Sequence, residues 1–387
     1  MTPAARIATA IEILDAVSDG MAAERALLRW SRSARHAGSK DRAAVRDHVF
    51  DGMRRWWSSA ASGGGETGRA RMIGLLREGG IDPGSLFDGS RYGPDPLTED
   101  EVRTPPPPDE ITALDCPAWL APDLRASLGA DFAAIMAALR HRAPTFLRAN
   151  LRKGDVASAI AALADDDIRA VPHSLSPTAI EVTDNPRGVA RSRAYLEGSV
   201  EVQDAASQAV VDMLPLERGM RVLDYCAGGG GKTLAMAGRC DAVFHAHDAD
   251  AARLVDLAPR ARRAGADVTI VDADALAAES AFDLVVVDAP CSGSGAWRRT
   301  PEGKLRLSRD RLDDLSQLQA GILRSAARHV APGGTLAYLT CSLLHQENGA
   351  VCEAFAQDAP SFERMTRRSL TPLDGGDGFY AEIFRLR

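Results

Sequence analysis

The chain has 387 residues, 45% of them hydrophobic and 26% charged, and its formal net charge is −7. This length suits two or three domains, and the composition is that of a globular protein, which excludes a disordered or fibrous chain. No run approaches the roughly 20 apolar residues that cross a bilayer, so we expect no membrane segment.

Cysteine usage and the first residues indicate where the protein works. The six cysteines form no CxxC pair and no disulfide spacing, so we expect free thiols and no zinc ribbon. His245 and His247 alternate along one predicted strand but lack a third ligand, so no metal site is expected. Residues 2–20 have the pattern of an amphipathic helix rather than of a signal peptide. These features predict a cytoplasmic protein.

Charge is distributed unevenly along the chain. Residues 82–110 hold eight acidic residues and two arginines, whereas residues 297–311 hold six basic residues and two acidic ones. A net negative charge argues weakly against nucleic acid as a partner. Because the acid is concentrated in one segment and a basic segment stands elsewhere, the net charge does not decide the question.

The first domain is predicted to be all-helical and to span residues 1–140. Apolar residues recur at helical spacing in two segments, namely Ile7, Ala10, Ile11, Leu14 and Val17 in the first and Val45, Val49, Met53 and Trp56 in the second. Residues 59–68 are rich in Gly and Ser and predict a loop. Residues 82–110 are acidic and Pro-rich and predict an extended connector, after which short helices continue to residue 139.

Residues 141–215 are predicted to form a small α+β element, with a strand over residues 146–151 and a helix over residues 156–163. In residues 216–387, helical segments separate short apolar runs, which cover residues 221–226, 243–247, 268–271, 284–288 and 335–341. This alternation predicts an α/β domain with a Rossmann-like parallel sheet, covered by helices on both faces. With strand order 3-2-1-4-5, such a sheet binds ligands beyond the carboxyl ends of its strands.

A glycine-rich turn joins the first of these strands to a helix, with the sequence Asp224-Tyr-Cys-Ala-Gly-Gly-Gly-Gly231-Lys232-Thr233. Such a turn lets a ligand approach the backbone closely. A Walker A loop requires glycine at Cys226 and a dinucleotide loop requires it at Thr233, so neither phosphate-binding pattern fits. A methyl donor without phosphates needs only small residues and nearby acids. We expect cofactor contacts from Cys226, Ala227, Gly228, Gly229 and Gly230, from Asp248 to the ribose and from Asp272 to the adenine.

Two cysteines follow neighbouring strands of the predicted sheet. Cys291 lies in Asp288-Ala-Pro-Cys-Ser-Gly-Ser-Gly295, and Cys341 lies in Tyr338-Leu-Thr-Cys-Ser342. Because the fourth and fifth strands are adjacent, both thiols should project into one crevice beside the glycine-rich turn. Buried cysteines are commonly structural, and that alternative remains open. A pair at adjacent strand ends nevertheless favours a shared chemical role.

The reaction that needs two thiols beside a methyl donor is methylation of pyrimidine C5. This carbon becomes nucleophilic only when a thiolate adds to C6, and after methylation the C5 proton must leave so that the thiolate is expelled. Asp288, if it is protonated or shares a proton, is placed to hydrogen-bond N3 of the base, and it is also expected to contact the cofactor. Enzymes that methylate amino groups usually have an aromatic residue where this chain has Cys291, so carbon is the favoured acceptor.

From about residue 144 to the C-terminus, the chain resembles the RNA cytosine-5 methyltransferases of the Sun/RsmB type. The similarity includes the glycine-rich turn, both cysteine motifs, and the segments Gly198-Ser-Val-Glu-Val-Gln203-Asp204-Ala-Ala-Ser207, Gln346-Glu347-Asn348 and Asp377-Gly378-Phe379-Tyr380. The resemblance implies S-adenosylmethionine as the cofactor, with Lys232 and Asp224 lining its pocket. It also implies that Cys341 is the nucleophile and that Cys291 promotes product release.

One departure from that family lies in the cofactor turn, where Gly228 and Gly229 replace Ala-Pro. Proline stiffens such a turn and glycine adds conformational entropy to the free chain, so we expect a lower cofactor affinity.

The helical N-terminus resembles the NusB-like domain of the ribosomal-RNA members, in the segment from Lys40-Asp41-Arg42-Ala43 to Gly52-Met53-Arg54-Arg55. This resemblance implies that residues 1–140 bind RNA and that 16S ribosomal RNA is the substrate; a plain helical accessory domain is the alternative. Residues 146–153 resemble the family's RNA-contacting element, which makes residues 141–215 an RNA-recognition element. The expected RNA contacts are Arg148, Asn150, Lys153, Arg298 and Arg299.

Three other functions remain open. The same chemistry could act on transfer RNA, which activity on deproteinised tRNA would reveal. A non-catalytic ribosome-assembly or RNA-binding factor would bind RNA without turnover. A nucleotide-dependent dehydrogenase would be stabilised by NAD rather than by S-adenosylmethionine. No feature of the sequence specifies an oligomeric state, and a monomer is the expectation.

Overall fold

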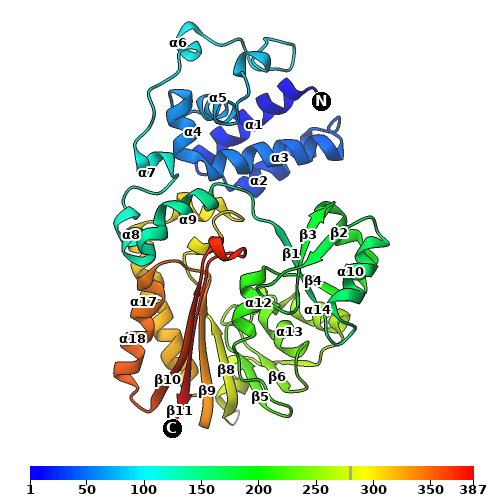
Figure 1. The fold of residues 1–387 in the computed structure, drawn as a ribbon, viewed down its shortest axis with the longest axis vertical. Helices are drawn as coiled ribbons and strands as arrows, with labels where there is room; N and C mark the ends of the chain where they lie inside the picture. The colour runs from blue at the N-terminus through cyan, green and yellow to red at the C-terminus, as the bar shows by residue number, and fades with distance from the viewer. Residues whose placement is uncertain (279–280) are drawn as a thin grey trace. The chain divides into compact units, whose positions relative to one another are not determined.

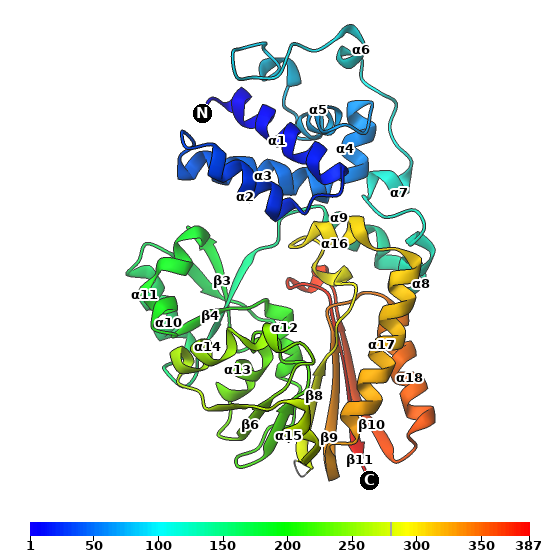
Figure 2. The ribbon, with the colours of Figure 1, turned by 180° about the vertical axis from the view of Figure 1, so that it is seen from behind.

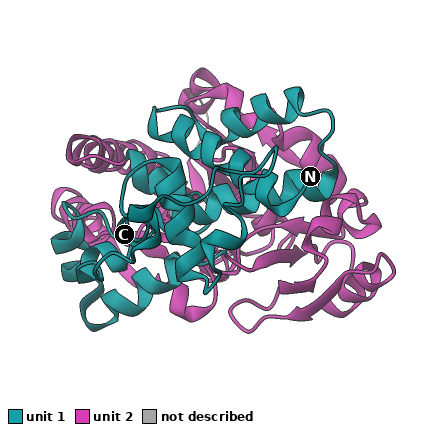
Figure 3. Ribbon diagram, turned by 90° about the horizontal axis from the view of Figure 1, so that it is seen from above, with its two compact units in different colours: residues 1–142, 297–306 teal, residues 143–296, 307–387 magenta. Residues whose placement is uncertain are grey.

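The computed structural model describes residues 1–278 and 281–387 (Figures 1 and 2). The chain divides into two compact units (Figure 3). We call Met1–Arg142 with Trp297–Arg306 the helical unit, and Ala143–Ala296 with Leu307–Arg387 the sheet unit. Throughout the described ranges, each helix is too short or too polar to cross a membrane.

The helical unit is built around a core between its first helices. Ile7, Leu14, Val45, Val49 and Met53 are all buried in this core, which confirms the predicted apolar faces. The helices of the unit are α1 (Pro3–Ser18), α2 (Ala23–Ser33), α3 (Ser39–Arg54), α4 (Trp56–Gly63), α5 (Gly68–Glu78), α6 (Glu99–Val102), α7 (Glu110–Ala113), α8 (Ala121–Leu128), α9 (Phe132–Leu139) and α16 (Pro301–Arg306), with 3-10 turns η1 (Pro83–Ser85) and η2 (Gly129–Asp131).

The loop predicted over residues 59–68 is wrong in its first half, because helix α4 continues to Gly63. Small residues serve here to bring two helices together. A Cβ atom added at Gly74 of α5 would lie 1.8 Å from the carbonyl oxygen of Ser59 in α4, and one added at Gly63 would lie 1.8 Å from that of Ala70. Glycine and serine therefore mark a close helix contact rather than a flexible turn.

The sheet unit begins with a small antiparallel sheet of order β2-β3-β1-β4. Its strand β1 stops two residues before the predicted end, since Asn150 opens a turn in which its carbonyl accepts from the N–H of Lys153. The elements of this part are β1 (Thr145–Ala149), α10 (Val156–Ala164), β2 (Arg169–Pro172), β3 (Ala179–Asp184), η3 (Pro186–Arg191), α11 (Arg193–Leu196), β4 (Val200–Val202) and α12 (Ala205–Val211).

The large sheet has the order β10-β11-β9-β8-β5-β6-β7. The five strands from β5 to β9 are parallel and follow the predicted order, whereas β11 and β10 add antiparallel strands at one edge. The elements are β5 (Arg221–Asp224), α13 (Gly231–Ala237), β6 (Val243–Ala246), η4 (Ala251–Leu254), α14 (Leu257–Ala264), β7 (Val268–Ile270), α15 (Ala273–Ala278), β8 (Phe282–Asp288), η5 (Ser294–Ala296), α17 (Arg309–Ala327), β9 (Val330–Thr340), η6 (His345–Glu347), α18 (Gly349–Asp358), β10 (Phe362–Leu370), η7 (Pro372–Asp374) and β11 (Phe379–Leu386).

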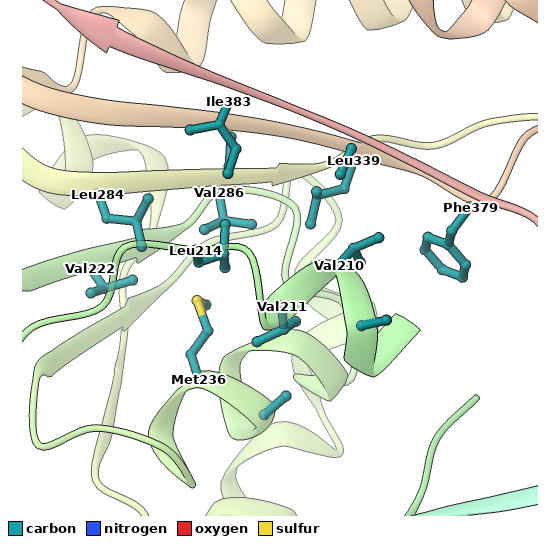
Figure 4. Packing of buried hydrophobic residues seen from close by; sticks show 14 of the residues in the cluster. Val210, Val211, Leu214, Val222, Met236, Leu284, Val286, Leu339, Phe379 and Ile383 are labelled. Atoms are coloured by element: carbon teal, nitrogen blue, oxygen red, sulfur yellow. The ribbon is translucent and has the colours of Figure 1, made fainter. Parts of the chain in front are cut away.

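Helices cover the large sheet on both faces, as predicted (Figures 1 and 2). Successive residues of a strand point to opposite faces. In β8, Leu284 and Val286 pack toward α12 and α13, in the cluster that Figure 4 shows together with Val211 and Met236. The intervening Val285 and Val287 pack toward α17 and α18. Burial on both faces explains why β8 is apolar almost throughout.

Candidate active site

The candidate site lies where the parallel strands of the large sheet end. The registers pair Asp224 at the end of β5 with Val286 of β8, and Asp288 at the end of β8 with Leu339 of β9. Beyond β8, the N–H of Ala289 still donates to the carbonyl of Leu339 at 2.9 Å. The segments that follow these strands therefore leave the sheet at one edge, as the sequence predicted.

The two cysteines of interest meet at this edge, with their sulfur atoms 3.4 Å apart. Both side chains are half-buried. The hydrogen bond with Cys341, together with burial, raises the pKa of Cys291 well above its usual value. Cys291 therefore keeps its proton near neutral pH, and its S–H group lies within hydrogen-bond distance of the Cys341 sulfur.

Asp224 ends strand β5 and is fully buried. The Thr233 hydroxyl donates to its Oδ2 at 2.6 Å, whereas its Oδ1 is buried and has no hydrogen-bond partner among the described residues. Burial raises the pKa of Asp224 to about 6. A buried carboxylate oxygen without a partner is uncommon in proteins, and a ligand ammonium group would satisfy it.

The glycine-rich turn is held in shape by groups outside it. Gly228 has a φ of +50°, a backbone conformation that glycine adopts without strain, and its N–H donates to Oδ2 of Asp248 at 3.0 Å. Asp248 is buried and forms an ion pair with Arg253 at 3.0 Å. The Arg260 guanidinium donates to the carbonyl of Gly229. Two arginines outside the turn thus fix the glycines that replace Ala-Pro.

A buried lysine connects the turn to the cysteine side of the site. Lys232 on α13 forms an ion pair with Asp288 at 2.6 Å, and its Nζ lies 4.8 Å from the centre of the Phe379 ring. Asp288 remains partly exposed. Because Lys232 compensates its charge, the Asp288 carboxylate is held in place between the glycine-rich turn and the Cys291 motif.

Two other expected cofactor contacts differ in their surroundings. Burial, reinforced by the charge of Asp224 and Asp248, raises the pKa of Cys226 and keeps this thiol neutral, so it is no competing nucleophile. Asp272 lies beyond β7 and is exposed, with its Oδ1 accepting from the N–H of Ala275 at the start of α15. Ala227 and Gly230 are buried within the turn.

The expected RNA contacts Arg148 and Asn150 are buried rather than exposed. The Arg148 guanidinium donates to Gln203 and to the carbonyl of Gly231 at 3.0 Å. The Asn150 amide donates to the carbonyls of Gly198 and Ala264, both at 2.8 Å. These side chains join the small sheet to the large one, so they are not available to RNA in this conformation, and we do not retain them as RNA contacts.

The remaining expected RNA contacts lie in different units. Lys153 is exposed in the sheet unit, and its Nζ donates to the carbonyl of Glu197. Arg298 and Arg299 belong to the helical unit, where Arg298 is buried and Arg299 half-buried.

The sequence patterns predict no role for Glu347, which lies in the segment Gln346-Glu347-Asn348. This carboxylate is fully buried and accepts hydrogen bonds from Ser292 and Ser342, the residues that follow the two cysteines. The signal for a role in the site was one charged residue in a segment whose other residues are polar but uncharged.

Comparison with known proteins agrees with this geometry. The family model of 16S rRNA methyltransferase RsmB/F matches residues 211–380, and that of the RsmF/B-like ferredoxin-like domain matches residues 116–188. A curated relative named Ribosomal RNA small subunit methyltransferase B, from Escherichia coli O6:K15:H31 (strain 536 / UPEC), is 34% identical over 285 residues. That match covers 70% of this chain and 66% of the relative. A protein of the same name from Salmonella arizonae is 34% identical over 287 residues, with the same coverage.

Solved structures show the same fold. The crystal structure of PH0851 superposes with a TM-score of 0.81 at 24% identity and covers 99% of both chains. NSun6 from Pyrococcus horikoshii with SFG has a TM-score of 0.62 at 16% identity and covers 70% of this chain and 98% of its own. At these identities the likeness is one of fold alone. The two family matches and the curated relatives show more: this chain belongs to the RsmB/F family of methyltransferases.

Proposed function

We propose that the protein transfers a methyl group from S-adenosylmethionine to C5 of a cytosine in RNA, with 16S ribosomal RNA as the substrate. The observation that carries this proposal is the pair of thiols, 3.4 Å apart at the end of β8 and β9. Methylation of an unactivated ring carbon needs one thiol to activate the base, and a second thiol at contact distance assists its release.

In the proposed reaction, the Cys341 thiolate forms a bond to C6 of the base. The electrons displaced to C5 would then form the new carbon–carbon bond with the methyl group, whose bond to the sulfonium sulfur of the donor would break to leave a neutral thioether. The C5 proton passes to a base in the crevice, the C5–C6 double bond is restored, and the C6–sulfur bond breaks to return the thiolate. A protonated Cys291 stabilises the Cys341 thiolate before addition and assists the elimination. Asp288 hydrogen-bonds N3 of the cytosine through a proton shared with Lys232, whose ammonium group donates to the Asp288 carboxylate.

The residues present fit S-adenosylmethionine, which supplies an electrophilic methyl group when bound. The unpartnered Oδ1 of Asp224 suits the amino group of this ligand. The buried Asp248 beyond β6 suits the ribose hydroxyls, and the exposed Asp272 beyond β7 is the proposed contact to the adenine. Residues 226–230 and Lys232 form the wall of the proposed pocket.

The choice of ribosomal RNA rests on the relatives, which are named for the small-subunit RNA. This chain spans 66% of their length, so the assignment of substrate is part of the proposal. The exposed Lys153 is the proposed phosphate contact of the sheet unit. We propose that the protein acts as a monomer.

The test is methyl transfer from labelled S-adenosylmethionine to naked 16S RNA, with transfer RNA as the competing substrate. We expect 5-methylcytosine in 16S RNA from the wild type, and a loss of at least about 10³-fold in Cys341→Ala, because the base is no longer activated. Cys291→Ala should instead accumulate a covalent RNA–protein adduct that withstands denaturing electrophoresis.

Each alternative outcome has a distinct meaning. An adduct in Cys341→Ala would exchange the roles of the two thiols, and full activity in both variants would refute the two-thiol mechanism. Product in transfer RNA alone would replace the proposed substrate.

A further inference from the structure

The turns that carry Cys291 and Cys341 share a buried carboxylate as an anchor. Oε1 of Glu347 accepts from the Ser292 N–H at 2.7 Å, and Oε2 accepts from the hydroxyls of Ser292 and Ser342, each at 2.5 Å. Ser292 follows Cys291 directly, and Ser342 follows Cys341 directly. One carboxylate, fully excluded from solvent, therefore connects the two serines that follow the cysteines.

A second residue completes this anchor from helix α17. Nε2 of Gln319 donates to Oε1 of Glu347 at 3.0 Å and to the carbonyl of Pro290 at 2.9 Å, so the Cys291 turn is held on both sides. Gln319 is itself fully buried. Four donors surround the carboxylate, and two of them are N–H groups that cannot act as acceptors. A carboxylate accepts all four of these hydrogen bonds, whereas an apolar side chain at this position would leave four buried donors without an acceptor.

The backbone alone does not fix the spacing of the two sulfur atoms. The hydrogen-bond ladder between β8 and β9 ends at the contact between Ala289 and Leu339, and both cysteines lie beyond it. The N–H of Gly295 donates to the carbonyl of Cys341 at 3.0 Å, which closes the far side of the Cys291 turn. Between these two points, Glu347 bridges Ser292 and Ser342, whose hydroxyl oxygens also lie 3.4 Å apart and both contact the Ser294 hydroxyl.

We propose that Glu347 is a positioning residue that sets the distance between the Cys341 and Cys291 sulfur atoms. It touches neither substrate nor cofactor and acts through Ser292 and Ser342. The inference deepens the proposed methyl transfer and rests on it for its meaning, because the nucleophile and the releasing thiol must reach the same base. A misplacement of about 1 Å in such a site costs roughly 10²-fold in rate.

The first test measures the spacing itself, independently of methyl transfer. Diamide accepts the two hydrogen atoms that two thiols release on forming a disulfide, and peptide mass spectrometry follows the Cys291–Cys341 bond with time. We expect its rate of formation to fall about tenfold in Glu347→Ala and less in the isosteric Glu347→Gln. Glu382→Gln is the matched control: it removes another buried carboxylate, which pairs with Arg364, and should leave the rate within about twofold of the wild type.

The second test separates positioning from general stability. Glu347→Gln should lower kcat by roughly 10- to 100-fold while KM for S-adenosylmethionine changes less than about threefold. If Glu347→Ala does not fold, Glu347→Gln carries both measurements. Wild-type disulfide rates and kcat in a folded Glu347 variant, with only a lower melting temperature, would overturn the inference. A wild type without methyl transfer would refute the proposed function, and the disulfide rates would still decide the role of Glu347.

Discussion

Asp224 belongs to the candidate site, and ionisation of its buried carboxyl group lowers the stability of the folded protein. Burial raises its pKa from 3.8 to about 6. Because the pKa of the native state lies above that of the unfolded state, ionisation opposes folding. The stability contributed by the protonated form is complete below pH 3.8 and is lost as the pH rises through about 6. At two pKa units, the loss amounts to about 3 kcal/mol at most.

Asp224→Asn should therefore raise the melting temperature of the free protein at pH 8, since the amide oxygen still accepts from Thr233 and carries no charge. At pH 4.5 the difference from the wild type should shrink, because there the native carboxyl is protonated. The affinity for S-adenosylmethionine should fall by about tenfold or more through loss of a charged acceptor. Scanning calorimetry and ligand titration at both pH values check this, and a variant less stable than the wild type at pH 8 would contradict it.

Replacement of glycine by alanine should change stability in opposite directions at two positions, because the space around the two glycines differs. Gly74 of α5 lies against the backbone of α4, where an added Cβ would lie 1.8 Å from the Ser59 carbonyl. Gly321 of α17 has no atom within 4 Å of an added Cβ. Helix propensity favours alanine at both positions by about 1 kcal/mol, so only the space available separates them.

We expect Gly74→Ala to destabilise the protein by roughly 3 kcal/mol, because α4 and α5 must move apart. Gly321→Ala, the matched control, should stabilise it by about 0.5–1 kcal/mol. Urea unfolding followed by circular dichroism measures both changes. Equal effects of the two substitutions would show that α4 and α5 do not make this close contact.

At the scale of the whole molecule, a segment that follows the Cys291 motif belongs to the helical unit. Trp297 is buried in that unit, and Nζ of Lys304 donates to the carbonyl of Arg54 at 2.8 Å. Nε of Arg54 in turn donates to the carbonyl of Arg298 at 2.6 Å. The helical unit is therefore assembled from two parts of the sequence that are separated by 154 residues, from Ala143 to Ala296.

A protein that lacks residues 1–142 should consequently be less stable than the intact chain. It loses the partners of Leu305 and Lys304, and exposure of one apolar side chain costs about 2 kcal/mol, or about 6 °C in melting temperature. Added residues 1–142 should restore part of the loss. The control is the full chain cut by protease within residues 82–110, because this cut breaks the chain while both parts stay present. A truncated protein with the same melting temperature as the intact chain would contradict the prediction.

The sequence by itself determined the features that depend on local pattern. Alternating apolar runs gave the five parallel strands and their order, and the chain connectivity placed Asp288, Cys291 and Cys341 at one edge. It did not predict strand β10, because residues 362–370 expose most of their side chains and carry no apolar alternation. The Gly/Ser run from residue 59 was assigned to a loop because its partner helix is not visible in the local sequence.

Tertiary structure alone decided which polar groups are buried and what they bind. Arg148 has the sequence pattern of an RNA contact, yet atoms from residues 203 and 231 enclose it. Glu347 has the pattern of a surface acid, yet donors from three separate segments surround it. The cost of burying a polar group is set by the partners it finds, and those partners come from distant parts of the chain. The spacing of apolar residues is a local property, so it predicts strands and helices. Whether a charged side chain is buried, and what it binds, depends on contacts that exist only in the folded chain.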